Sequence, residues 1–220
     1  MSAVTRIKVC CISSVEEARL AVHHGASALG LVSHMPSGPG VIGEGLIAEI
    51  AAKVPPGVAS FLLTSKQSMA EIIEQQRRLR VNTIQICDYL TCSSYADLRA
   101  ALPGIALVQV IHVTGEESIT QAVAVAPHVD GILLDSGNPG LAIKELGGTG
   151  RRHDWQLSRR IVETVGVPVF LAGGLRPDNV ALAIATVRPF GVDVCTGVRT
   201  DDRLDERKLD AFVSAVRAAG

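Results

Sequence analysis

The chain has 220 residues, with 21 basic and 22 acidic side chains and a formal net charge of -1. A chain this close to neutral has no general attraction to nucleic acid or to an anionic membrane, so we expect neither as a partner. Its five cysteines are an odd number without zinc-finger spacing, which argues against a secreted disulfide framework and a structural metal. The apolar run near the N-terminus is too short for a signal peptide or a membrane span. These features predict a cytoplasmic protein.

The composition favours a single α/β domain. Hydrophobic residues make up 47% of the chain and aromatic residues only 3%. The core must therefore consist mainly of Val, Leu, Ile and Ala, as in buried parallel strands. An α/β barrel commonly occupies about 200 to 250 residues as one unit. We expect residues 1–220 to form one domain.

Short β-rich runs alternate with stretches of helical period along the whole chain. The predicted strands are Ile7–Cys11, Ala28–Val32, Val58–Leu63, Thr83–Cys87, Leu107–His112, Gly131–Asp135, Pro168–Ala172 and Gly191–Cys195. The predicted helices are Val15–His24, Leu46–Lys53, Met69–Arg80, Ser94–Ala101, Ser118–Ala126, Gln156–Val165, Asn179–Val187 and Glu206–Ala218. Such units with right-handed crossovers predict a closed (β/α)₈ barrel. The alternative is an open doubly wound sheet, which normally uses fewer strands.

Several residues predict where helices begin and end. The predicted N-terminal capping groups are Ser14 with Glu17, Ser68 with Glu71, and the pair Asp178-Asn179. Gly25 is in the position that closes the first helix.

In a barrel of this kind, function lies in the loops that follow the C-terminal ends of the strands. The first strand ends at Cys10 and Cys11, and strand alternation predicts that one of them points into the barrel mouth and the other away. A thiolate at the mouth can act as a base or nucleophile, and the charge of Lys8 on the same face could lower its pKa. The alternative is that both cysteines are small buried hydrophobic residues.

The sixth predicted strand is apolar until it ends at Asp135. A carboxyl group at this point can serve as a general acid or base, or it can simply bond the start of the next loop. That loop contains Gly147-Gly148-Thr149-Gly150. Barrels often bind phosphate with backbone amides of the loops after strands seven and eight, and here these loops contain Gly173-Gly174 and Thr196-Gly197. A local phosphate site is therefore predicted.

Four ordered motifs resemble those of the phosphoribosylanthranilate isomerase family, and the resemblance covers nearly the whole chain. They are Lys8-Val9-Cys10-Cys11, Leu133-Leu134-Asp135 followed by the glycine loop and Asp154-Trp155, Leu171 to Val180, and Gly191 to Val198. The resemblance implies a cofactor-independent Amadori rearrangement of N-(5-phosphoribosyl)anthranilate in tryptophan biosynthesis.

By this resemblance Cys10 is the general base and Asp135 the general acid. It also implies that the phosphorylated sugar is bound by the following residues: Gly147, Gly148, Thr149, Gly173, Gly174, Asp193, Thr196 and Gly197. No metal and no organic cofactor is implied. The oligomeric state is left open.

Three departures concern the anthranilate end of the expected pocket. Gly40 stands where the family has an arginine for the anthranilate carboxylate, Cys87 stands where it has a histidine, and Cys11 replaces a glycine. The loss of a bidentate arginine contact would cost about 1.5 to 3 kcal/mol in binding. His34, in the same loop as Gly40, is the candidate replacement, although a loop histidine is more often merely solvated.

Two other functions remain open. The chain is a paralogue that acts on another phosphorylated sugar, or it is a non-catalytic phosphosugar-binding protein. Retention of both proton-transfer residues, Cys10 and Asp135, argues against the second.

Overall fold

The computed structural model describes residues 4–90 and 95–219. Within them, eight parallel strands pair in chain order and close into a barrel, with β1 pairing β8. The strands are β1 Arg6–Val9, β2 Ala28–Val32, β3 Ala59–Thr64, β4 Thr83–Ile86, β5 Ala106–His112, β6 Gly131–Asp135, β7 Val169–Leu171 and β8 Gly191–Val194. The predicted barrel is therefore confirmed over the open sheet.

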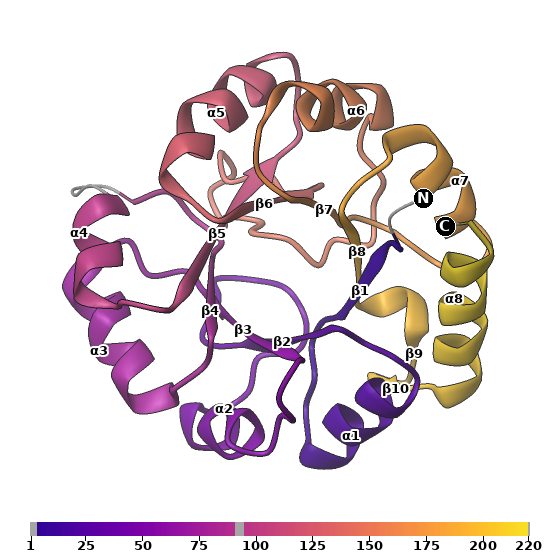
Figure 1. The fold of residues 1–220 in the computed structure, drawn as a ribbon, viewed down its shortest axis with the longest axis horizontal. Coiled ribbons are helices and arrows are strands. Elements are labelled where there is room, and N and C mark those ends of the chain that lie inside the picture. Colours follow the sequence, from indigo (N-terminus) through magenta and orange to yellow (C-terminus); the bar gives the residue numbers. More distant parts are fainter. Residues whose placement is uncertain (1–3, 91–94, 220) are drawn as a thin grey trace.

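Helices surround the barrel as an outer ring (Figure 1). They are α1 Val15–His23, α2 Glu44–Ala51, α3 Met69–Leu79, α4 Tyr95–Ala101, α5 Glu117–Val125, α6 Trp155–Thr164, α7 Val180–Val187 and α8 Glu206–Ala219. Short 3-10 turns η1 (Ala126–His128) and η2 (Thr196–Val198) and a small hairpin of β9 (Arg199–Thr200) and β10 (Arg203–Leu204) complete the described elements. No helix among these residues is long and apolar enough to cross a membrane.

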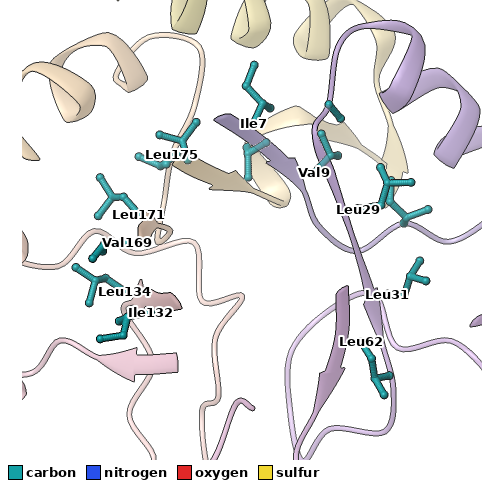
Figure 2. Packing of buried hydrophobic residues seen from close by; sticks show 14 of the residues in the cluster. Ile7, Val9, Leu29, Leu31, Leu62, Ile132, Leu134, Val169, Leu171 and Leu175 are labelled. Carbon is teal, nitrogen blue, oxygen red and sulfur yellow. The ribbon is translucent and has the colours of Figure 1, made fainter. Parts of the chain in front are cut away.

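The core has two layers because neighbouring residues of a strand point to opposite faces. On β6, Ile132 and Leu134 belong to the layer between strands and helices, whereas Leu133 belongs to the cluster inside the barrel. Figure 2 shows members of the outer layer on several strands, including Val9 on β1 and Leu31 on β2. The aliphatic composition thus fills both layers with few aromatic rings.

Two aromatic residues pack inside the barrel below its mouth. The rings of Phe61 and Phe170 lie edge to face with centroids 5.8 Å apart. The ammonium group of Lys8 lies 5.3 Å from the centroid of the Phe61 ring. This fully buried lysine therefore packs against the face of an aromatic ring, a contact that favours the charged form.

Most differences from the predicted elements are at their ends. Ladder pairing stops before Cys11, whose φ of 61° is incompatible with a continuing strand. The hydroxyl of Ser14 caps α1 and Gly25 follows its end, as predicted. Ser68 makes no side-chain cap hydrogen bond to α3, and the carboxylate of Glu71 pairs with Lys66.

Two further helix starts are predicted at Asp178-Asn179 and at Ser94, and Asn179 is indeed the residue that precedes α7. The side chain of Asn179 does not cap α7; it accepts a hydrogen bond from the amide of Arg176 and donates one to the carbonyl of Gly174. The predicted start of the fourth helix, Ser94, lies outside the described residues.

Truncation of a core residue on α8 tests the packing of this helix against the barrel. Phe212→Ala should lower the free energy of unfolding by about 3 to 5 kcal/mol, because Phe212 is fully buried and its removal leaves a cavity. Urea denaturation followed by circular dichroism measures this. Leu182→Ala on α7 is the control, since Leu182 is 61% exposed and should change stability by less than about 0.5 kcal/mol. Equal effects of the two substitutions would contradict the described packing of α8.

Candidate active site

A pocket lies at the C-terminal ends of the strands, as predicted for this fold. Both predicted proton-transfer residues, Cys10 and Asp135, line it. The other lining residues come from the loops after β1, β2, β4, β6, β7 and β8 and from the strand ends: Cys11, Val32, Met35, Ser37, Gly38, Pro39, Leu63, Gln85, Cys87, Leu146, Gly147, Gly148, Thr149, Gly150, Ala172, Gly173, Gly174, Leu175, Asp193, Cys195 and Thr196.

Cys10 follows the last residue of β1, and its backbone continues the ladder to β8. Its amide donates a hydrogen bond to the carbonyl of Val194 on β8 at 2.8 Å. The side chain is buried, and burial raises the pKa of the thiol from its ordinary value of 9.0 to about 11, although the charge of Lys8 acts in the opposite direction. The expected lowering by Lys8 is present but is outweighed by desolvation.

A buried ion pair lies beneath this thiol. Nζ of Lys8 is 3.0 Å from Oδ1 of Asp193, and the two residues face each other in the register of β1 and β8. Burial alone would favour the neutral amine, but the negative charge of Asp193 holds the pKa of Lys8 above its usual value. Asp193 therefore neutralises a lysine inside the barrel. The family resemblance predicts that Asp193 binds the phosphorylated sugar, whereas the ion pair gives this carboxylate a structural role.

Asp135 ends β6 and is fixed by its own loop. Its Oδ1 accepts a hydrogen bond from the amide of Ser136 at 2.7 Å, and the hydroxyl of Ser136 is 2.7 Å from that of Thr149. A Cβ atom at Gly147 would overlap the other carboxyl oxygen, Oδ2. Gly147 therefore leaves room for the carboxyl group.

At the end of β1, the orientation of the two cysteines differs from the prediction that one points into the barrel mouth and the other away. Cys10 and Cys11 both line the pocket, because the left-handed backbone of Cys11 ends the strand and with it the alternation of side chains. Cys11 is joined to Cys195 by a disulfide, whereas the cysteine count had predicted no disulfide framework. Its carbonyl accepts a hydrogen bond from Nη2 of Arg199, which also pairs with Glu17.

Three loops meet at the predicted phosphate end. Gly173 and Gly174 have φ angles of 84° and 64°, and a Cβ at Gly174 would lie 2.8 Å from the carbonyl oxygen of Gly150. Thr196 begins η2 on the β8 side of the same pocket. Gly197 is not among the lining residues; a Cβ there would overlap the carbonyl of Leu175, so its hydrogen lets the loops after β7 and β8 pack together.

Two of the three departures, Cys11 and Cys87, line the pocket, whereas Gly40 lies beside Cys11 and is not among the lining residues. A Cβ at Gly40 would overlap Cβ of Cys11 and lie 2.8 Å from its Sγ, so Cys11 fills the space beside residue 40. Cys87 lines the pocket, and burial raises the pKa of its thiol. His34 is exposed and is not among the lining residues, so it does not supply the missing cation.

Within the described part of the chain, no lysine, arginine or histidine lines the pocket. The described residues also contain no group of three or more His, Cys, Asp or Glu side chains that could hold a metal ion. Two features were not identified from the sequence: the apolar lining residues Met35 and Leu146, and the buried ion pair between Arg199 and Glu17. The local sequence pattern gave no signal for the disulfide: Cys195 directly follows β8 and Cys11 is the second residue after β1, and only the pairing of these two strands brings them together.

The chain is similar to known proteins over nearly its full length. The family model described as N-(5'phosphoribosyl)anthranilate (PRA) isomerase matches residues 7–215. N-(5'-phosphoribosyl)anthranilate isomerase of Methanocella arvoryzae is 34% identical, with 97% of this chain and 99% of the relative covered. Isomerase 2 of Methanosarcina mazei is 37% identical, with 94% and 92% covered.

Solved structures give the same result. Phosphoribosyl anthranilate isomerase of Thermotoga maritima is 27% identical with a TM-score of 0.81, with 97% of this chain and 99% of that chain covered. A phosphoribosyl anthranilate isomerase in complex with reduced 1-(o-carboxyphenylamino)-1-deoxyribulose 5-phosphate is 25% identical with a TM-score of 0.78 and the same coverage.

The buried ion pair can be tested by removing its cation. Lys8→Met should lower the free energy of unfolding by about 3 to 5 kcal/mol, because it leaves Asp193 buried without a partner. Urea denaturation measures the loss. The double variant Lys8→Met/Asp193→Asn should recover most of it, since no unpaired charge remains. A double variant as unstable as the single one would show that packing of the lysine stem, and not its charge, is what matters.

Proposed function

Because the chain belongs to the phosphoribosylanthranilate isomerase family, we propose that it converts N-(5-phosphoribosyl)anthranilate to the 1-deoxyribulose 5-phosphate product in tryptophan biosynthesis. The observation that carries the proposal is the presence of Cys10 and Asp135 in one pocket, together with glycine loops at one of its ends. The reaction is an aldose–ketose isomerisation that needs only proton transfers, which positioned side chains can supply.

Asp135 acts first, as the general acid. Its carboxyl group protonates the ring oxygen of the ribose, the bond from that oxygen to C1′ breaks, and the nitrogen lone pair forms a C1′=N iminium. The amide of Ser136, which donates to Oδ1, stabilises the carboxylate that results. Gly147 leaves Oδ2 accessible at the pocket wall.

Cys10 acts second, as the general base. Its thiolate removes the proton from C2′, and the electron pair of that bond neutralises the iminium and gives an enolamine. The enolamine then tautomerises to the ketose. Burial disfavours the thiolate, whereas the ammonium of Lys8 and the iminium of the opened substrate both favour it. The base is thus strongest when the substrate is activated.

We assign the phosphoryl group to the end formed by Gly173, Gly174 and Thr196, where glycine turns let backbone amides approach an anion. The aryl group then lies toward Cys11 and Met35. An alternative substrate, another phosphorylated aminosugar, is favoured by one observation. Among the described residues that line the pocket, no cationic side chain takes the place of the family arginine that would bind the anthranilate carboxylate.

The proposal is tested with freshly generated phosphoribosylanthranilate, whose fluorescence is lost on turnover. Cys10→Ser and Asp135→Asn should each lower kcat by at least about 100-fold, with little change in stability, as expected for proton transfer in the transition state. Thermal unfolding of both variants is the control. Absence of turnover by the wild-type protein would exclude this substrate and leave the alternative one.

The raised pKa of Cys10 predicts how the ionisation and reactivity of this thiol depend on pH. The thiolate is the form that is alkylated, so the rate of iodoacetamide alkylation at Cys10, followed by mass spectrometry, should rise about tenfold per pH unit from pH 7 and level off only near pH 11. The raised pKa also means that the folded state prefers the thiol. Its contribution to stability is present below pH 9 and is lost as the pH rises through 11, so circular dichroism must accompany each point. An alkylation rate at Cys10 that stays constant between pH 7 and 9 would contradict the raised pKa of this thiol.

A further inference from the structure

We propose that the disulfide between Cys11 and Cys195 is a positioning element of the pocket that thiol–disulfide exchange opens and closes. When oxidised, it ties the loop after β8 to the end of β1 and holds the phosphoryl-binding end against the strand that carries Cys10. When reduced, it frees that loop and weakens binding of the phosphorylated sugar. The kinetic part of this inference rests on the proposed function.

The backbone geometry suits such a bond. The Cα atoms of Cys11 and Cys195 are 5.9 Å apart, within the usual range for disulfides. Their strands, β1 and β8, are neighbours in the closing ladder, although the two residues are separated by 184 positions in sequence. Both cysteines line the pocket, so the bond is part of its wall.

Each sulfur is adjacent to a functional part of the pocket. Cys195 directly precedes Thr196 in the phosphate end, and Cys11 directly follows Cys10. Gly40 on the opposite loop has no side chain where one would overlap Cys11. The disulfide therefore fills the space that a side chain at residue 40 would need.

Cys11 also has a partner for its reduced state. Its Sγ lies 3.8 Å from the carbonyl oxygen of Pro39, to which a thiol can donate a weak hydrogen bond. Reduction thus exchanges a covalent link to the loop after β8 for a weak contact with the loop after β2. The hydrogen bond from Arg199 to the carbonyl of Cys11 does not involve sulfur and keeps the neighbouring segments together.

The exchange needs a dithiol as reductant or a small-molecule disulfide as oxidant. In reduction, a dithiol gives two electrons to the sulfur–sulfur bond and one proton to each cysteine sulfur, and it becomes a disulfide itself. The neighbouring thiol of Cys10 does not compete for either sulfur, because burial raises its pKa to about 11 and keeps it protonated at neutral pH.

The first experiment establishes the bond. Protein treated with oxidised glutathione is unfolded in denaturant and alkylated with iodoacetamide. Mass spectrometry of the wild-type peptides should find label on Cys10 and Cys87 and a linked pair of peptides containing Cys11 and Cys195, whereas Cys11→Ser should give no linked pair. Five labels in the oxidised wild type would overturn the inference.

The second experiment measures the consequence. Reduction with dithiothreitol should raise KM about tenfold and raise Kd for inorganic phosphate similarly, because preorganisation of the phosphate end is lost. The kcat value should change less than about twofold, since Cys10 and Asp135 remain on their own strands. Melting should occur about 10 °C lower, as expected for loss of a bond that closes a long loop.

The matched control is Cys11→Ser/Cys195→Ser, which should behave as the reduced wild type and should not respond to dithiothreitol. A merely structural bond would lower the melting temperature and leave KM and the phosphate Kd unchanged, and this result would overturn the positioning role. If neither redox state turns over phosphoribosylanthranilate but the phosphate Kd still depends on reduction, the proposed function fails while the inference stands.

Discussion

The pairing of β1 with β8 is the constraint on which the site depends. It places Lys8 opposite Asp193, holds the amide of Cys10 on the carbonyl of Val194, and brings Cys11 next to Cys195. None of these contacts is local, since the two strands are at opposite ends of the chain. A barrel that failed to close would leave the lysine without its counter-charge and the pocket without one of its walls.

Electrostatics at the barrel mouth follow from this closure. The interior takes the Cys10 thiol out of water and so favours its neutral form, while the ion pair beneath it supplies a cation that is itself neutralised by Asp193. The thiol therefore stays largely protonated until the substrate contributes positive charge. In the proposed mechanism, Cys10 is therefore a weak base in the free protein and becomes a stronger one when the iminium forms.

Residues 40 and 11 compete for the same space beside the pocket. By the family resemblance Gly40 stands in place of an arginine, and Cys11 occupies the space that a side chain at residue 40 would need. An arginine restored at residue 40 alone would collide with Cys11, and the backbone of Gly40 has a φ of 80°, which disfavours any side chain. The space at this place is therefore set by the two loops together.

The sequence by itself determined the barrel, the position of Cys10 and Asp135 at strand ends, and the glycine loops, because hydrophobic periodicity and turn residues act over short stretches of chain. The strand alternation predicted for Cys10 and Cys11 was wrong because the left-handed backbone at Cys11 depends on packing against Gly40 and Cys195. The role of Asp193 in the ion pair, the space that Gly197 leaves for the loop after β7, and the disulfide were decided only by the tertiary structure. The reason is physical: each depends on register between strands, which places residues distant in sequence within a few ångströms of one another and has no local signature.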